Sequence, residues 1–302
     1  MREAVYIGLK ELMLKHPEII VIDTDVGEAT RVKKLAEEFR DRVLNIGITE
    51  QSSFGIAAGL CLEGLRPYVV MFSMFVLRGV EIIRQAIGYP WLDVTIIGTH
   101  AGVSVGEDGP THQCIEDIGC FRAIPGFRIL SPADRYEAIS VIKESYRVKQ
   151  PCYIRIARQQ FGYVYDEIPE FQTFRVIEDY GDDFTIVATG IVVYEAKKAL
   201  DVLKSDGLRG RLINVVQIKP LDKEILKFIS ERIICVEDHN IYGGLFSAIS
   251  EEISQEGIKA KILPIGIRDR YGKSGKPYDV LKYFKLDCLS IYEEVKKWLR
   301  YS

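Results

Sequence analysis

A short segment in the first half of the chain could place an acid where ligands bind. Residues 45–50 (NIGITE) end a strand-like run, turn at Gly47 and open a helix, with Thr49 as its expected N-cap. Glu50 then lies at the carboxyl edge of a sheet, which is where open α/β sheets bind ligands. The small residues at 55–59 (GIAAG) would allow another group to approach closely. Taken alone, a favourable interaction of Glu50 with the helix dipole is the simpler interpretation.

A glycine-rich loop that carries two histidines is the second candidate. His100 follows directly on an apolar run, and the next residues hold three glycines, the acids Glu107 and Asp108, and His112. A long ordered loop inside a compact domain is more often functional than not. A metal site of His100, Asp108 and His112 is one alternative, although the spacing matches no usual zinc pattern. Only four histidines occur in the chain, and this favours a functional role over a structural one.

Two aromatic residues and two arginines also lie at expected strand ends. Phe72 and Phe75 follow an apolar run and could form one wall of a slot for a planar ring, although such pairs are most often core. Arg155 and Arg158 lie at the end of another run. Guanidinium groups suit phosphate, and a surface salt bridge is an equally good interpretation without other information.

Alternating strand and helix patterns must position these residues. The expected strands of the first half are continuous runs rich in Val, Ile and Leu, which is typical of a parallel sheet buried on both faces. They span residues 18–23, 43–46, 67–72, 94–98, 127–130 and 152–156. The expected helices span residues 3–15, 32–39, 50–62, 78–87 and 133–149.

A second alternation begins after an acidic segment without helical period, which predicts a linker over residues 166–183. Strands are expected at residues 184–188, 211–215, 233–236 and 261–265, and helices at 193–204, 223–229, 244–255 and 292–299. The chain is therefore predicted to be an α/β protein with two three-layer α/β/α domains and mostly parallel sheets. The domains are expected at residues 1–165 and 184–302.

Composition excludes several classes of function. The net charge of -3 gives no basic footprint for nucleic acid or for an anionic membrane surface. The longest apolar runs fall well short of the ~20 residues that a membrane span needs. The six cysteines are scattered without a CxxC pair, and the amphipathic N-terminus does not resemble a signal peptide. We therefore expect free thiols and a cytoplasmic protein.

Taken together, these residues resemble the transketolase family of thiamine-diphosphate-dependent enzymes. Residues 47–50 (GITE) match its glycine–isoleucine–any–glutamate motif, and residues 106–113 (GEDGPTHQ) match a long and specific signature. Phe72 and Phe75 fit its aromatic pocket. Further matches are residues 131–134 (SPAD), 158–159 (RQ), 188–190 (ATG), 218–222 (IKPLD), 237–240 (EDHN) and 243–244 (GG). The resemblance covers nearly the whole chain, as a pyrimidine-binding domain followed by the C-terminal domain.

One part of the family pattern is missing. The family's N-terminal domain holds the cofactor's diphosphate and Mg²⁺ through a Gly-Asp-Gly motif, and residues 181–183 (GDD) lack its second glycine. The resemblance therefore implies a split subunit whose separate partner chain carries the Mg²⁺ ligands. A fragment of a longer protein is the alternative. We expect a heterotetramer in which a dimer of this subunit is flanked by two partner chains.

The resemblance implies roles at the cofactor. Glu50 would face N1′ of the aminopyrimidine of thiamine diphosphate and favour the imino tautomer that takes the proton from C2. This role needs a protonated carboxyl, which burial favours. Phe72 and Phe75 would hold the pyrimidine. The family usually supplies a third aromatic a few residues later, whereas residues 76–78 here read VLR.

The resemblance also implies roles at the substrate, with a two-carbon ketol unit passing from a ketose phosphate to an aldose phosphate. His100 and His112 would contact substrate oxygens, where an imidazole can move protons or stabilise an oxyanion. Asp108 would read the configuration of a sugar hydroxyl. Arg158, and near the terminus Arg2, would bind the substrate phosphate.

Three alternatives share part of this pattern. A 1-deoxy-D-xylulose-5-phosphate synthase has the same domains and cofactor, but Glu107 and Gln113 follow the transketolase pattern. A 2-oxo-acid dehydrogenase β subunit has the same layout without the histidine loop. A cofactor-free regulatory subunit would not be expected to keep Glu50. Residues 237–240 and 269–275 of the second half are interpreted as packing or subunit contacts.

Overall fold

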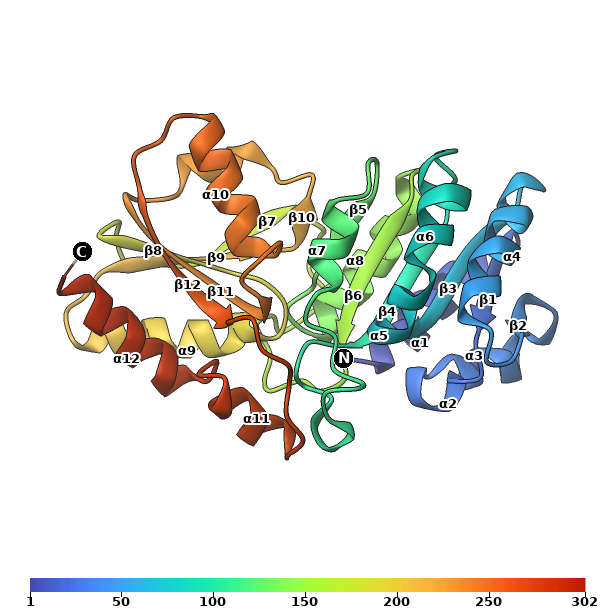
Figure 1. The fold of residues 1–302 in the computed structure, drawn as a ribbon, viewed down its shortest axis with the longest axis horizontal. Helices are drawn as coiled ribbons and strands as arrows, with labels where there is room; N and C mark the ends of the chain where they lie inside the picture. Colours follow the sequence, from blue (N-terminus) through green and yellow to red (C-terminus); the bar gives the residue numbers. More distant parts are fainter. Residues whose placement is uncertain (302) are drawn as a thin grey trace.

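Two mostly parallel sheets, each between layers of helices, make up the fold of residues 1–301, which the computed structural model describes (Figure 1). The predicted α/β class with two three-layer domains is confirmed. Strands β1, β3, β4, β5 and β6 of the first sheet and β8 of the second are buried along their whole length, as their continuous apolar runs indicate. Of the helices in the described range, none combines the length and apolar character needed to cross a bilayer.

The first sheet has seven strands in the order β10-β5-β6-β4-β3-β1-β2. Six come from the first domain and are parallel to one another, whereas β10 follows the second domain's strand β9 and pairs antiparallel with β5. The strands are β1 (Ile19–Asp23), β2 (Val43–Asn45), β3 (Arg66–Phe72), β4 (Thr95–Ala101), β5 (Arg128–Leu130), β6 (Cys152–Ala157) and β10 (Gln217–Lys219). The second domain therefore extends the first domain's sheet.

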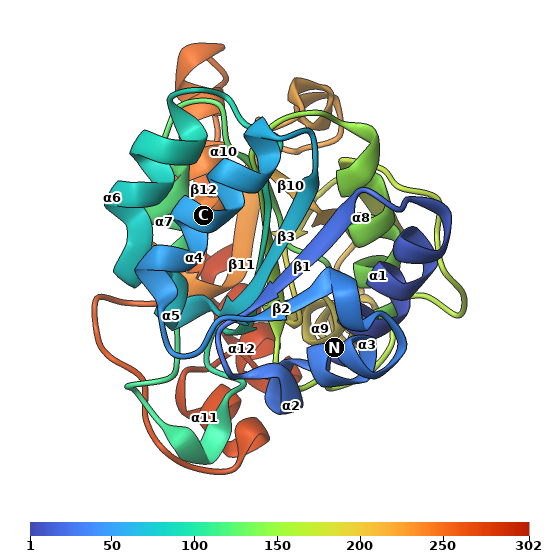
Figure 2. The ribbon, with the colours of Figure 1, turned by 90° about the vertical axis from the view of Figure 1, so that its right-hand side faces the viewer.

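Helices cover both faces of this sheet, with α1, α3 and α8 on one face and α4 to α7 on the other (Figure 2). The α-helices are α1 (Glu3–Lys15), α2 (Gly27–Thr30), α3 (Val32–Glu38), α4 (Glu50–Leu62), α5 (Ser73–Val76), α6 (Val80–Ile82), α7 (Asp117–Arg122) and α8 (Arg135–Arg147). Shorter helical turns are η1 (Arg40–Arg42), η2 (Leu77–Gly79), the π-helical η3 (Ile83–Gly88) and η4 (Gly106–Asp108).

The helix expected over residues 78–87 is present but irregular. The chain is helical over residues 77–88 and passes through η2, α6 and the π-helical η3. Gly79 leaves helical geometry, and the Phe54 ring lies 2.3 Å from the position where a Cβ of Gly79 would be. This close approach of α4 requires glycine and interrupts the helix.

The second sheet has five strands in the order β12-β11-β8-β9-β7. All are parallel except β7, which pairs antiparallel with β9 at the edge. The strands are β7 (Phe174–Asp179), β8 (Phe184–Ala188), β9 (Gly210–Val215), β11 (Arg232–Asn240) and β12 (Lys261–Ile267). The linker expected over residues 166–183 is thus wrong in its second part. As an edge strand, β7 is only half-buried, so it lacks the apolar run that marked the other strands.

Helices α9 (Val192–Ser205) and α12 (Cys288–Leu299) lie on one face of the second sheet, and α10 (Leu245–Gln255) lies on the other (Figure 1). The short helix α11 (Pro277–Tyr283) follows β12, and the turn η5 (Lys223–Lys227) replaces a predicted helix. Neither α7 nor α11 was predicted, because helices of six and seven residues show less than two turns of periodicity.

Two apolar layers run through both domains. One joins α1 and α8 of the first domain to α9 and α12 of the second, through residues such as Leu9, Ile142, Leu200 and Ile291. The other joins α4 and α7 to α10. Burial of this kind stabilises by about 25 cal/mol per Å² of apolar surface, so the domains are held together by continuous cores.

Candidate functional site

Strand register explains why the candidate residues gather at one edge of the first sheet. Phe72 at the end of β3 pairs with Thr99 of β4, and Ala101 of β4 pairs with Ala157 of β6. Because parallel strands end at the same edge, Phe72, His100 and Arg158 lie on neighbouring strand ends. Glu50 follows β2 at the same edge of the sheet, beyond β1.

Glu50 begins α4 after a tight turn. Gly47 has φ +75°, which favours glycine, and Thr49 is the N-cap residue as predicted. The Thr49 hydroxyl donates to the carbonyl of Ile46 at 3.1 Å and does not cap the helix. The Glu50 side chain is half-buried, and no residue in the range 1–301 forms a hydrogen bond or ion pair with its carboxylate. The carboxylate is therefore available to a bound molecule.

Three rings form a stack beside this edge. The Phe72 ring lies between His100, with ring centroids 3.7 Å apart, and Phe75, with centroids 5.1 Å apart. His112 meets both phenylalanine rings edge-on, at 6.3 and 5.7 Å. Phe72 is buried, whereas Phe75 and His112 are half-buried. The Phe75 ring is therefore accessible to a ligand, and the buried Phe72 ring packs against it.

His100 is held as a neutral imidazole. It is 2% exposed, and burial, followed by the nearby Arg2 and Arg158, lowers its pKa to about 3. The Thr99 hydroxyl donates to the carbonyl of Met71 at 3.2 Å and lies 2.9 Å from Nδ1 of His100. With its hydrogen directed at Met71, this hydroxyl accepts from Nδ1–H, which leaves Nε2 as an acceptor.

Asp108 and Arg158 form a pair at the outer part of the site. Asp108 Oδ2 lies 3.1 Å from Arg158 Nη1, which also donates to the carbonyl of Val105 at 2.6 Å. Both side chains remain partly exposed. An exposed pair of this kind contributes little to stability, so its partners can exchange it for contacts with a ligand.

Four arginines line one pocket of ≈ 490 Å³, which we call the arginine pocket. They are Arg2, Arg31, Arg135 and Arg158, and Met1, Glu3 and residues 159–163 complete the wall. Glu3 is the one acid of the lining, and it pairs with Arg31. The Nε atoms of Arg135 and Arg158 are buried and have no hydrogen-bond partner among the described residues. Burial, followed by Arg31 and Arg158, lowers the pKa of Arg2. Crowded guanidinium groups with unmet donors indicate a site for an anion.

Sequence reasoning missed Arg31 and Arg135. Arg31 has φ +76°, a conformation that costs an arginine free energy and that no sequence pattern revealed. Arg135 is the first residue of α8, where a cation opposes the helix dipole. This unfavourable placement directly after the matched SPAD segment could have identified it.

The structure does not support the metal alternative. In the range 1–301, no three or more His, Cys, Asp or Glu side chains lie close enough together to hold a metal ion. Asp108 pairs with Arg158, and the histidines contact aromatic rings and threonine hydroxyls. All six cysteines are free.

Comparison with known proteins identifies the two domains. The family model described as the transketolase pyrimidine-binding domain matches residues 1–162, and the model of the transketolase C-terminal domain matches residues 173–291. A Methanocaldococcus jannaschii protein named as a transketolase C-terminal section is 41% identical, over 98% of this chain and 96% of that protein. One of the subunits of an apulose-4-phosphate transketolase of Phocaeicola vulgatus is 31% identical, over 96% of this chain and 95% of that protein.

Longer relatives and solved structures are similar to this chain over both domains. A 1-deoxy-D-xylulose-5-phosphate synthase of Caldanaerobacter subterraneus is 32% identical, and this chain spans 47% of its length. A solved structure described as a split gene transketolase, inactive beta4 tetramer, superposes with a TM-score of 0.88 at 32% identity, over 99% of this chain and 97% of that one. The chain therefore belongs to the transketolase family and consists of that family's pyrimidine-binding and C-terminal domains.

Proposed function

We propose that this chain is the C-terminal subunit of a split transketolase, which transfers a two-carbon ketol unit from a ketose phosphate to an aldose phosphate. The observation that carries the proposal is the joint placement of the Phe75 ring, the acceptor nitrogen of His100 and the arginine pocket at one sheet edge. These features can face a planar cofactor ring, a substrate hydroxyl and a phosphate, respectively.

The residues fit the pyrimidine part of thiamine diphosphate. Phe75 offers a half-buried aromatic face, and the Glu50 carboxylate has no partner among the described residues. When bound, the cofactor supplies the carbon nucleophile that a ketol transfer needs. Glu50 would hold a proton against the ring nitrogen, and closure of the site by a partner chain would favour the protonated carboxyl by desolvation. The Mg²⁺ and diphosphate ligands are expected on that partner.

The substrate would extend from Phe75 past the histidines to the arginine pocket. Nε2 of neutral His100 can accept a hydrogen bond from a hydroxyl, and the half-buried His112 would contact a substrate oxygen. Asp108 would accept from a sugar hydroxyl. The phosphate would engage Arg158 and Arg2, which fits the excess of positive charge in the pocket.

One face of α4 supports the need for partners. Within α4, Leu62 is 72% exposed and a Cβ added to Gly55 or Gly59 would meet nothing within 4 Å. Ile48, in the turn before the helix, is 76% exposed. An open apolar face on the helix that begins with Glu50 suits a docking chain. The similar solved structure is described as inactive, as a beta4 tetramer. We propose that this chain self-associates and forms a heterotetramer with a separate N-terminal subunit.

A role as part of a 1-deoxy-D-xylulose-5-phosphate synthase is the second candidate, because the 32% identity to that enzyme is close to the 31% identity to the apulose-4-phosphate transketolase chain. The loop residues Glu107 and Gln113 follow the transketolase pattern and favour the first candidate. Gln113 is buried and donates to the carbonyls of Lys273 and Val103 at 2.9 and 3.4 Å, so it also supports the loop structure.

A product assay separates these candidates. This chain, the candidate partner chain, thiamine diphosphate and Mg²⁺ would be given xylulose 5-phosphate with ribose 5-phosphate, and separately pyruvate with glyceraldehyde 3-phosphate. The proposal predicts a seven-carbon ketose phosphate from the first pair and no carbon dioxide from the second. Carbon dioxide without ketol transfer would contradict it and favour the synthase or a 2-oxo-acid dehydrogenase.

A further inference from the structure

The second domain contacts the loop that carries the proposed substrate-binding residues. We call residues 101–115, which hold Asp108 and His112 and follow His100, the substrate loop. Two segments of the second domain, residues 237–240 and 272–277, lie against it. Neither segment belongs to the site described above.

The inner contact is a buried ion-pair network at the two ends of the substrate loop. Arg155 Nη1 donates to Asp238 Oδ1 at 2.8 Å, and its Nε lies 3.1 Å from Asp117 Oδ2. All three side chains are buried. Asp238 Oδ2 lies 1.8 Å from the position of a Cβ on Gly102, and Arg155 Nη2 donates to the carbonyl of Cys114. One network therefore touches both ends of the loop.

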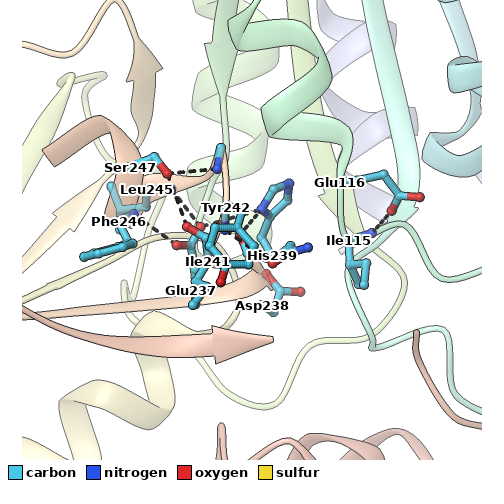
Figure 3. A network of polar contacts seen from close by, with 12 residues as sticks. Ile115, Glu116, Glu237, Asp238, His239, Ile241, Tyr242, Leu245, Phe246 and Ser247 are labelled. Atoms are coloured by element: carbon cyan, nitrogen blue, oxygen red, sulfur yellow. Dashed lines mark hydrogen bonds and ion pairs between the residues drawn. The ribbon is translucent and has the colours of Figure 1, made fainter. Parts of the chain in front are cut away.

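Backbone contacts fix the segment that carries Asp238. Figure 3 shows Asp238 and His239 beside Ile115 of the first domain, and the amide of Asn240 donates to the Ile115 carbonyl at 2.8 Å. Glu237 accepts from the first two amides of α10, at 2.7 and 3.0 Å, which anchors the segment within the second domain (Figure 3). The end of β11 is thus rigidly joined to both domains.

The outer contact covers the middle of the substrate loop. Gln113 Nε2 donates to the carbonyl of Lys273 at 2.9 Å. Gly106 and Gly109 have φ of +81° and +75°, and their missing side chains leave room for Pro277 and Ser274, which lie 2.8 and 2.1 Å from the Cβ positions. The loop therefore follows the surface of the second domain on either side of Asp108 and directly after His112.

We propose that the second domain positions the substrate loop, through Asp238 on the inside and residues 272–277 on the outside. These are positioning residues, because none of them touches the reacting atoms and each acts through Asp108, His112 or the loop backbone. The inference rests on the proposed function for the reaction that it affects, although the contacts themselves do not. It gives the C-terminal domain a part in substrate recognition.

A substitution at Gly272 tests whether the second domain positions the substrate loop. A Cβ there would lie 1.5 Å from Gln113 Oε1 and 2.7 Å from its Cδ, so Gly272→Ala must displace the buried Gln113 side chain. We expect the adjoining His112 to shift with it. The matched control is Lys273→Ala, because Lys273 contributes its backbone carbonyl to the loop, whereas its ammonium lies over the ring of Tyr283 in the second domain. Gln113→Met is the second variant, since it keeps the side-chain volume and removes the hydrogen bond to the Lys273 carbonyl.

The first measurement is hydrogen exchange of the full chain alone. We expect exchange of residues 101–115 to rise about tenfold in Gly272→Ala and Gln113→Met, with β1, β3 and α9 unchanged and Lys273→Ala like wild type. Unchanged exchange in the loop, or an equal increase throughout the chain, would overturn the inference. This readout does not depend on the reaction.

The second measurement is ketol transfer by the complex with the partner chain. A displacement near 1 Å lowers rates on the order of 10²-fold, so kcat/KM for the sugar phosphates should fall by about that factor in Gly272→Ala while thiamine diphosphate affinity stays unchanged. The double variant with Gln113→Met should lose less than the product of the single effects. Wild-type kcat/KM in both variants would refute the inference, whereas an inactive wild-type complex would refute the proposed function.

Discussion

At the scale of single residues, His100 has an unfavourable backbone conformation and a buried side chain. Its φ of +59° is uncommon outside glycine, and its imidazole is buried against the Phe72 ring and surrounded by cationic groups. Such a placement costs free energy that the surrounding structure must supply. It delivers a neutral ring with a defined acceptor nitrogen, which is what contact with a substrate hydroxyl requires.

The lowered pKa of His100 predicts a pH dependence of stability. The pKa is about 3 in the folded chain and ~6.5 when unfolded, so between these values only the unfolded chain takes up the proton. Wild type should therefore lose stability relative to His100→Gln as pH falls from 6.5 towards 3, by ~2 kcal/mol at pH 5. Urea unfolding of both proteins at pH 7.5 and 5 measures this. A difference that does not change with pH would contradict the prediction.

Arg135 predicts a selective effect on phosphorylated substrates. Its guanidinium lines the arginine pocket and forms no hydrogen bond or ion pair with the described residues, so it is available to a substrate phosphate. Arg135→Gln should raise KM for sugar phosphates by about tenfold, the order expected for one lost charge-assisted hydrogen bond, with little effect on an unphosphorylated ketose. The control is Arg147→Gln, at the exposed end of the same helix. An equal effect on both substrate types would exclude the phosphate role.

At the scale of elements, the start of α8 organises one wall of the arginine pocket. Asp134 caps the helix by accepting from the amide of Glu137 at 2.9 Å, and its other oxygen accepts from the amides of Val164 and Tyr165 at 2.8 and 2.9 Å. This carboxylate is buried. It therefore fixes both Arg135, the next residue, and the chain that follows Arg158.

Asp134→Ala should destabilise the chain by about 3 kcal/mol, because it removes a cap and leaves buried amides without an acceptor. Asp134→Asn keeps one acceptor oxygen and should cost about half as much. Thermal unfolding of both variants against wild type checks the order. Equal stability of Asp134→Ala and wild type would show that the pocket wall does not depend on this cap.

Elements with strong periodicity could be predicted from the sequence, and those made by tertiary pairing could not. Helices α1 and α4 have the expected bounds, because their apolar periods and end signals are local. Strands β7 and β10 were missed, since β7 is a half-buried edge and β10 has three residues that pair with the first domain's sheet.

The candidate site, too, could be predicted from the sequence only in part. The specific motif over residues 106–113 and the expected strand ends placed His100, His112, Asp108 and Arg158 together. The sequence could not show that His100 covers one face of Phe72, or that Arg31 and Arg135 join Arg2 in one pocket. These facts depend on side-chain directions and on contacts between segments far apart in the chain.

In the whole molecule, the two domains are packed against each other, whereas one side of the first domain is open towards other chains. Two apolar layers and the Arg155 network join its domains, whereas Glu50 and the exposed face of α4 have no covering element among the described residues. We therefore expect this subunit to fold alone and its cofactor site to be completed by a partner.

The dependence of this chain on a partner can be measured by titrating the partner chain into a fixed amount of this chain. Ketol transfer from xylulose 5-phosphate to ribose 5-phosphate is followed at each point. Activity should be absent without the partner, rise linearly and level off at one partner per chain. Glu50→Gln should level off at least about 100-fold lower, as expected for loss of a positioned acid, while the control Glu63→Gln, at the other end of α4, matches wild type. Full activity of this chain alone, or of the Glu50→Gln complex, would contradict the account.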